Sequence, residues 1–115
     1  MNRGDVVVSP FPFQDKLGEK ARPAVVVQES SRNRKSWNVV LVMITGNLRD
    51  AGRPDNILVD PGTPEGSLSG LSGPSLIKCA HLATVRQQRM TVIGRLSATH
   101  LRQLDDSLKA ILDLA

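Results

Sequence analysis

Short apolar runs, each of a length typical of a β-strand, alternate with turn residues up to about residue 97. Val, Ile and Leu dominate the runs, whereas Gly, Pro, Ser and Asn gather between them. The pattern predicts strands over residues 4–9, 22–28, 37–45, 56–60, 75–85 and 89–97. The run at 37–45 is nearly continuous, so we expect it to be the longest strand and to be covered on both faces.

The hydrophobic period changes after residue 97. Apolar residues then recur at steps of three and four, which is the spacing of one helix face; they are Leu101, Leu104, Leu108, Ile111 and Leu112. Ser97 is placed to cap this helix, with Leu96 and Leu101 at the staple positions on either side. We expect His100, in the first turn, to lie on the solvated surface.

The connections contain polar, basic or turn-forming residues. Pro10 and Pro12 are expected to end the first strand, and a polar loop then leads to residue 21. Residues 30–36 are predicted to form a basic connection, and the Gly-, Ser- and Pro-rich segment 61–75 a loop inside the domain. Together these elements predict a mainly β protein, a strongly bent antiparallel sheet or small barrel with a C-terminal helix. A chain of 115 residues fits a single domain, residues 1–115.

Composition narrows the choice of partners only modestly. The formal charge of +4 permits a polyanion such as RNA or DNA, but it also fits a solvated basic surface. Aromatic residues are few, so base stacking is not the expected main binding mode unless Phe11 and Phe13 provide it. No apolar run approaches the roughly 20 residues of a membrane span, and the first residues do not resemble a signal peptide. We therefore expect a cytoplasmic protein without a membrane partner.

Common catalytic motifs are missing from the sequence. It contains no Gly-rich phosphate loop, no G-x-S-x-G and no His/Cys cluster, so we expect neither a cofactor nor a bound metal. Cys79 stands alone, which excludes an internal disulfide. His81 could act as a general acid or base, although a packed strand histidine is the simpler interpretation. Asp105 and Asp106 fit the polar face of the helix.

Two polar residues stand at the ends of predicted strands. Arg22 precedes Pro23, and a residue before proline is held extended. Thr45 ends the apolar run 37–45, directly before Gly46 and Asn47. By itself, this local pattern favours a surface arginine and a turn-initiating hydroxyl.

Five segments, in this order, resemble the PemK/MazF family of toxin endoribonucleases. They are RGDVVVSPFPF, KARPAVVV, VVLVMITGN, SLIKCAHLATV, and IGRLS before the closing helix, and together they extend over nearly the whole chain. The resemblance implies a small SH3-like barrel, a homodimer, and metal-independent cleavage of single-stranded RNA at a short sequence. It also implies an antitoxin partner whose disordered C-terminal tail lies across the dimer, and DNA binding through the antitoxin complex.

The resemblance assigns roles to individual residues. The family's catalytic arginine precedes the proline of the second strand, which is Arg22 here, and its catalytic hydroxyl ends the third strand, which is Thr45. A Kid-like branch adds an Arg-Cys-Asp triplet, where this chain has Lys78, Cys79 and Ala80. Lys78 keeps a cation but not a bidentate fork, and Ala80 has no carboxylate. Arg22 and Thr45 therefore remain as the catalytic residues that this chain has in common with the family.

This assignment implies a mechanism in which the ribose 2′-hydroxyl attacks the neighbouring phosphorus and leaves a 2′,3′-cyclic phosphate and a 5′-hydroxyl. Arg22 would stabilise the charge on the phosphoryl oxygens, and Thr45 would orient the phosphate or the 2′-hydroxyl. The proton acceptor stays open between a water, Arg22 and another residue. Further RNA contacts are expected from Lys78 and from loop residues that could equally be solvated: Phe11, Phe13, Lys16, Lys20, Asn47, Arg49 and Arg53.

Two alternatives remain open. The first is a gyrase inhibitor on the same fold, like the CcdB branch, but that branch uses aromatic and acidic residues near its C-terminus, and this chain ends in LDDSLKAILDLA without an aromatic residue. The second is a module that binds RNA or a peptide without catalysis, an alternative that Ala80 and Gly46 leave open.

Overall fold

The computed structural model describes residues 1–11 and 20–114, and it contains every strand and the helix that the sequence predicts. The strands are β1 (Asp5–Phe11), β2 (Lys20–Val26), β3 (Asn38–Thr45), β4 (Asn56–Val59), β5 (Ser75–Arg86) and β6 (Thr91–Arg95). The helices are α1 (Ser30–Asn33), a 3-10 turn (Gln87–Arg89) and α2 (Ala98–Ile111). The expected mainly β architecture with a C-terminal helix is therefore confirmed.

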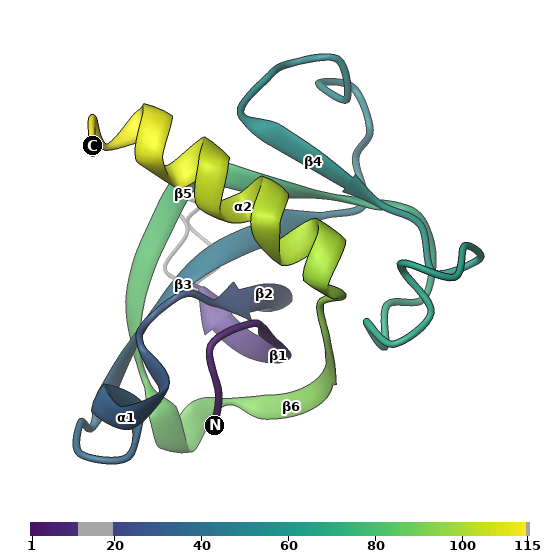
Figure 1. Cartoon of the computed structure of the whole chain (residues 1–115). Coiled ribbons are helices and arrows are strands. Elements are labelled where there is room, and N and C mark those ends of the chain that lie inside the picture. The colour runs from purple at the N-terminus through teal and green to yellow at the C-terminus, as the bar shows by residue number, and fades with distance from the viewer. Residues whose placement is uncertain (12–19, 115) are drawn as a thin grey trace.

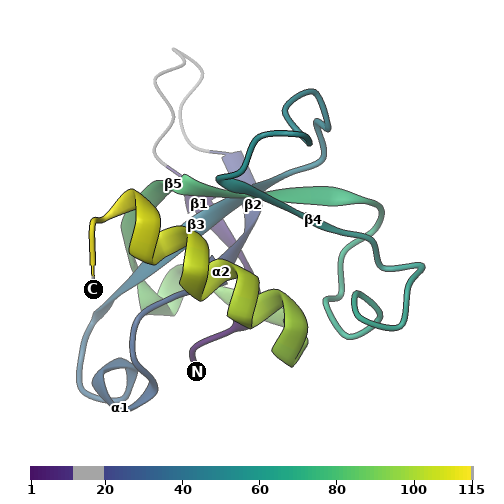
Figure 2. The ribbon, with the colours of Figure 1, turned by 45° about the horizontal axis from the view of Figure 1, so that its top comes forward.

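The described strands form one antiparallel sheet in the order β4-β5-β3-β2-β1-β6. The sheet curls strongly, and α2 lies across one of its faces (Figures 1 and 2). The buried residues between this face and the helix form the α2-side core, which includes Ile44, Ile77, Leu104 and Leu108. A second core fills the other face and includes Val7, Ala24, Val26 and Leu41. The bent sheet thus has an apolar layer on each side.

Strand β3 is covered on both faces, as its apolar run predicts. Val42 and Ile44 belong to the α2-side core, whereas Val39 and Leu41 belong to the second core. The prediction that this strand is the longest is wrong, because β5 has 12 residues and β3 has 8. Polar residues interrupt the apolar run of β5, but the strand continues through an irregularity where its register on β3 shifts.

Strands β1 and β2 extend further than the prolines suggest. Pro10 lies inside β1 opposite Ala21, and the pairing continues to the Phe11–Lys20 pair, so Pro10 does not end the strand as expected. Arg22 is consequently the third residue of β2 rather than the first. Pro23, which lacks an N–H, stands just before the β2–β3 pairing begins at Ala24.

The basic connection 30–36 contains a helix that the sequence did not predict. Glu29 caps this one-turn helix, α1, and its carboxylate accepts the backbone N–H groups of Ser31 and Arg32. The Ser31 hydroxyl also donates to this carboxylate, and these bonds lower the pKa of Glu29 from 4.5 to about 2. A helix this short buries only Asn33 and therefore leaves no apolar period in the sequence.

The start of α2 confirms the predicted cap but corrects the place of His100. The Ser97 hydroxyl accepts the His100 backbone N–H at 3.2 Å, and Leu96 is buried in the α2-side core against which Leu101 packs. His100 is only 7% exposed, contrary to the expected solvated position. Its Nδ1 lies 3.3 Å from the Ser97 hydroxyl, so the ring turns back toward the helix start instead of toward water.

The apolar stripe of α2 is buried only in part. Leu104 and Leu108 lie in the α2-side core and Leu101 packs against it, as predicted. Ile111 and Leu112 are 36% and 49% exposed. These two residues lie at the end of the helix, beyond the part of its stripe that faces the sheet.

A loop covers the edge strand β6. The Arg95 backbone N–H donates to the Leu68 carbonyl at 2.8 Å, which ties the 61–74 segment to the strand. Gly94 makes this approach possible, because a Cβ built there would overlap the backbone of Leu68 and Ser69. A covered edge strand is protected from pairing with other chains.

The Gly94→Ala substitution is expected to destabilise the protein by about 1–3 kcal/mol, the usual cost of forcing extra atoms into a packed site. Urea unfolding followed by circular dichroism would measure the loss. Gly73→Ala is the matched control, because a Cβ at Gly73 meets nothing within 4 Å. Equal stability of the two variants would show that the loop does not pack closely on β6.

Candidate functional site

Arg22 and Thr45 lie level with each other on neighbouring strands. β2 and β3 pair through Ala24–Met43, Val25–Val42 and Val26–Leu41. Continuing this register by two residues places Arg22 opposite Thr45. The register, continued beyond its last pair, thus aligns two residues that are 23 positions apart in the chain (45 − 22).

Both side chains are on the sheet face away from α2. Side chains alternate along a strand, so Arg22 shares a face with Ala24, and Thr45 shares one with Met43. Ala24 belongs to the second core and Met43 packs against it. Arg22 is exposed and Thr45 is half-buried. We call the part of this face that carries Arg22 and Thr45 the site face.

Lys78 is another polar residue of the site face. It pairs with Met43 of β3 on one side and with Asn56 of β4 on the other. The adjacent Ile77 is fully buried in the α2-side core, and so is Ile44, the neighbour of Thr45. The backbones that hold Lys78 and Thr45 are thus anchored in the core.

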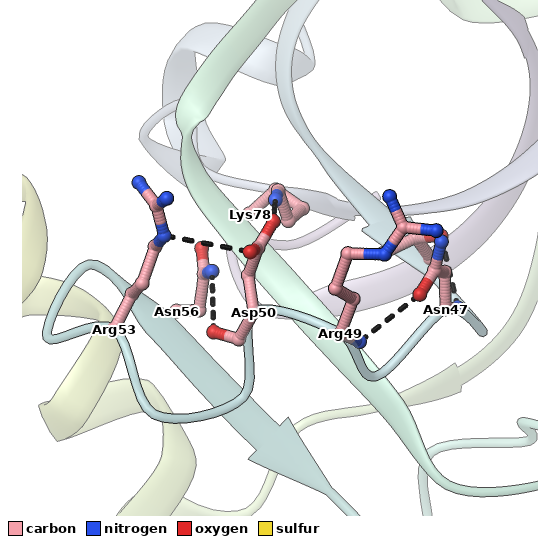
Figure 3. A network of polar contacts seen from close by, with 7 residues as sticks. Asn47, Arg49, Asp50, Arg53, Asn56 and Lys78 are labelled. Carbon is pink, nitrogen blue, oxygen red and sulfur yellow. Dashed lines mark hydrogen bonds and ion pairs between the residues drawn. The ribbon is translucent and has the colours of Figure 1, made fainter.

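The Thr45 hydroxyl starts the turn that leaves β3. Its oxygen accepts the Asn47 backbone N–H at 3.1 Å, and the Asn47 side chain in turn accepts the Arg49 N–H at 3.0 Å (Figure 3). The expected turn-initiating hydroxyl is therefore present. Because Thr45 uses an oxygen lone pair in this bond, its hydroxyl proton can still be donated to a ligand.

Asp50 is the residue of this region that the sequence pattern did not single out. Its carboxylate lies 3.3 Å from the Lys78 ammonium and 3.4 Å from Nε of Arg53, so it stands between two cations (Figure 3). The sequence predicts RNA contacts for Asn47, Arg49 and Arg53 of this loop. A single loop carboxylate, in contrast, looks like an ordinary solubilising residue. Only the folded loop brings it to Lys78.

The remaining predicted contact residues fall into two groups. Asn47, Arg49 and Arg53 are exposed on the β3–β4 connection, beside Lys78 and Asp50 (Figure 3). Phe13 and Lys16 lie outside the described residues, as do the side chains of Phe11 and Lys20. For both groups, RNA contact stays a prediction.

Cys79, Ala80 and His81 lie where the register of β5 on β3 shifts, since consecutive β3 residues Val42 and Met43 pair with Leu82 and Lys78. Cys79 is buried, and burial raises the pKa of its thiol, so it is a core residue rather than a nucleophile. Ala80 and His81 are exposed. The simpler interpretation of His81, a packed strand histidine, is therefore wrong.

Neither a cluster of metal ligands nor a membrane-spanning helix occurs in the part of the chain that the structure describes. Within residues 1–11 and 20–114, no three His, Cys, Asp or Glu side chains gather where they could hold a metal ion. No helix in these same residues is long and apolar enough to cross a membrane.

Solved structures share this fold. A mycobacterial endoribonuclease in complex with its cognate antitoxin is 22% identical with a TM-score of 0.76, over 100% of this chain and 97% of that one. The toxin MazF-mt6 of Mycobacterium tuberculosis is 23% identical, with a TM-score of 0.72 over 94% of this chain and 97% of that one. A MazE–MazF structure from Deinococcus radiodurans gives 18% identity and a TM-score of 0.78, covering 100% of this chain and 98% of that chain. At such identities, the likeness shows the fold.

Sequence comparison defines the family. A search of curated proteins finds no match. The family model for the PemK-like, MazF-like toxin of type II toxin-antitoxin systems, however, matches residues 2–112. This match extends over nearly the whole chain. The chain therefore belongs to the PemK-like, MazF-like toxin family of type II toxin-antitoxin systems.

Proposed function

We propose that this protein is the endoribonuclease toxin of a type II toxin-antitoxin system and that it cleaves single-stranded RNA at a short sequence without a metal ion. Family membership and the names of the structural neighbours support an RNA-cleaving toxin. The observation that supports the site assignment is the β2–β3 register, which aligns Arg22 with Thr45 when it is continued two residues beyond the Ala24–Met43 pair, with Lys78 on the same face.

The proposed reaction is an internal transfer at phosphorus. The ribose 2′-oxygen forms a bond to the neighbouring phosphorus while the bond from phosphorus to the 5′-oxygen breaks. The products are a 2′,3′-cyclic phosphate and a 5′-hydroxyl, so the 2′-hydroxyl loses a proton and the leaving oxygen gains one. Water takes no part in the bonds that form, which is why a metal-bound nucleophile is not needed.

Arg22 is assigned to the charge that builds up on the phosphoryl oxygens. A guanidinium offers parallel N–H donors that match two phosphate oxygens. The extended backbone before Pro23, inside a paired strand, fixes where this side chain begins. Fixed donors aimed at developing charge are usually the largest single contribution to catalysis.

Thr45 and Lys78 complete the proposed site. The Thr45 hydroxyl proton can be donated to a phosphate oxygen, since its own oxygen is engaged by Asn47. Lys78 adds a second positive charge next to the scissile phosphate, although as an ammonium rather than a fork. The group that accepts the 2′-hydroxyl proton is not assigned.

The proposed partners follow from the same comparisons. The mycobacterial neighbour is an endoribonuclease bound to its cognate antitoxin. We accordingly propose that this protein is a homodimer and is neutralised by a cognate antitoxin, whose disordered tail folds against it. The formal charge of +4 supports a negatively charged substrate.

The direct test is to incubate the purified protein with single-stranded RNA in the presence of EDTA. We expect discrete fragments that carry a 2′,3′-cyclic phosphate and a 5′-hydroxyl, as read by mass spectrometry. Intact RNA under these conditions would contradict the proposed function. Inhibition of gyrase supercoiling with the RNA intact would instead favour the CcdB-like alternative.

The substitution Thr45→Val is expected to reduce kcat by about ten- to a hundred-fold, because a hydrogen bond to a charged group is worth about 1.5–3 kcal/mol. Single-turnover cleavage would measure the loss. Thr45→Ser is the matched control, since it keeps the hydroxyl and the turn. If valine and serine had the same effect, the hydroxyl would have no part in the reaction.

A further inference from the structure

The Asp50 carboxylate forms the centre of a small ionic network. One oxygen, Oδ2, lies 3.3 Å from Nζ of Lys78, and the other, Oδ1, lies 3.4 Å from Nε of Arg53. Figure 3 shows the carboxylate between these two side chains. The side chain of Lys78 is only 17% exposed and that of Asp50 is 36% exposed, so water screens this pair less than a pair on the open surface.

The loop holds Asp50 in place by hydrogen bonds of its own. The Asn56 side-chain amide donates to the Asp50 carbonyl at 3.0 Å. The backbone N–H of Arg53 donates to the same carbonyl at 3.1 Å, and that of Asn56 donates to the Arg53 carbonyl at 3.1 Å. Asn56 belongs to β4 and is itself opposite Lys78. The backbone of Asp50 is therefore anchored to the strand that pairs with Lys78.

Lys78 needs such an anchor if it is to act at a fixed point. A lysine has a flexible four-carbon stem and a compact charge, so its ammonium has no preferred position unless a partner supplies one. An ammonium has three N–H donors, and one bond to Asp50 leaves others that can reach a phosphate oxygen. A partly exposed ion pair contributes little to the stability of the fold, so its main effect is on geometry.

We propose that Asp50 is a positioning residue of the cleavage site and holds the Lys78 ammonium where it meets the phosphate of the RNA. This inference rests on the proposed function. Asp50 acts through Lys78 and does not itself touch the reacting atoms. Asp50 lies on the β3–β4 loop, so a loop residue would fix the position of the Lys78 ammonium on strand β5.

Simple electrostatics predicts the opposite effect, which makes the inference testable. A carboxylate near the site repels RNA phosphates, so removal of its charge should tighten RNA binding and leave kcat unchanged or higher. If Asp50 positions Lys78, its removal instead lowers kcat even when KM falls. Charge repulsion and positioning therefore differ in the sign of the change in kcat.

The experiment compares wild type, Asp50→Asn, Lys78→Met and the double variant in RNA cleavage. We expect Asp50→Asn to lower kcat by about 10- to 100-fold without raising KM, because a misplacement of about 1 Å can cost a factor of that order. In the Lys78→Met background, Asp50→Asn should have no further effect, since the residue it positions is gone. Asp50→Glu should recover part of the lost kcat.

Two controls distinguish positioning from a general charge effect and from a loss of stability. Glu65→Gln removes the same charge from an exposed loop and should leave kcat unchanged. The unfolding midpoint in urea should be nearly the same for Asp50→Asn and wild type. The effect of Asp50→Asn is also measured in an Arg53→Met background. If Asp50→Asn still lowered kcat in the Lys78→Met background but no longer did so in the Arg53→Met background, Asp50 would act through Arg53 and the inference would be overturned.

The outcomes also distinguish the inference from the proposed function. If wild type leaves RNA intact, the proposed function fails and the inference fails with it. If wild type cleaves RNA while Asp50→Asn keeps its full kcat, the function stands and the role of Asp50 is refuted. Additive losses in the double variant would refute it as well.

Discussion

Replacement of Arg22 by alanine is expected to lower the rate of RNA cleavage by about a hundred- to a thousand-fold, because one fixed donor to developing charge is worth that much in enzymes. The residue is exposed on the site face, whereas Ala24, two positions further along the strand, is fully buried. The substitution therefore removes the guanidinium without opening a cavity in the core. Single-turnover cleavage of a defined RNA would measure the rate.

Two further substitutions define what Arg22 contributes. Arg22→Lys keeps the charge but loses the bidentate fork, so its rate should fall between those of wild type and Arg22→Ala. Arg102→Ala removes the same charge from an exposed position of α2, on the other side of the sheet, and should leave the rate unchanged. Undiminished cleavage by Arg22→Ala would show that the reaction takes place elsewhere.

Truncation of Leu104 to alanine is expected to lower the free energy of unfolding by about 2–5 kcal/mol, the range for large apolar side chains removed from a core. Leu104 is 0% exposed and lies in the α2-side core with Ile44 and Ile77. Because those two residues precede Thr45 and Lys78, the same core supports the strands of the proposed site. Urea unfolding would give the change in free energy.

The control for this prediction is on the same helix. Leu112→Ala shortens a leucine that is 49% exposed, and its effect should stay within about 0.5 kcal/mol. Similar losses for the two variants would mean that the C-terminal part of α2 is packed as tightly as its centre. That result would contradict the partial burial of the apolar stripe.

The sequence was sufficient for the strands and for α2, because each of them has its own short-range pattern, whereas the one-turn helix α1 has none. Apolar runs bounded by Gly and Pro marked the strands, and a change of period marked α2 with its Ser97 cap. The errors arose where strand pairing or a helix cap overrides local preference. Pro10 was expected to end β1, yet the hairpin pairs Pro10 with Ala21 and continues the strand. His100 was expected in solvent, yet its ring turns back to the cap.

The candidate site could be predicted residue by residue but not as an arrangement. Arg22 and Thr45 each have a simple local interpretation. It was the order of five segments along the chain, two of which contain these residues, that carried the family resemblance. Nothing local indicates that they share a face and a level, because this depends on the register between β2 and β3. Lys78 joins them only through the shift in the pairing of β5 with β3.

The sequence by itself determined the class of fold, the strand that is buried on both faces, the capped helix and the identities of the candidate cations. These properties depend on periodicity and on neighbours within a few residues, which a single chain displays directly. Only the tertiary structure decided which side chains meet. The contact between Asp50 and Lys78 joins residues 28 positions apart, and it exists because the β3–β4 loop folds back onto β5. A loop carboxylate has no pattern of its own, so its partner appears only when the sheet is assembled.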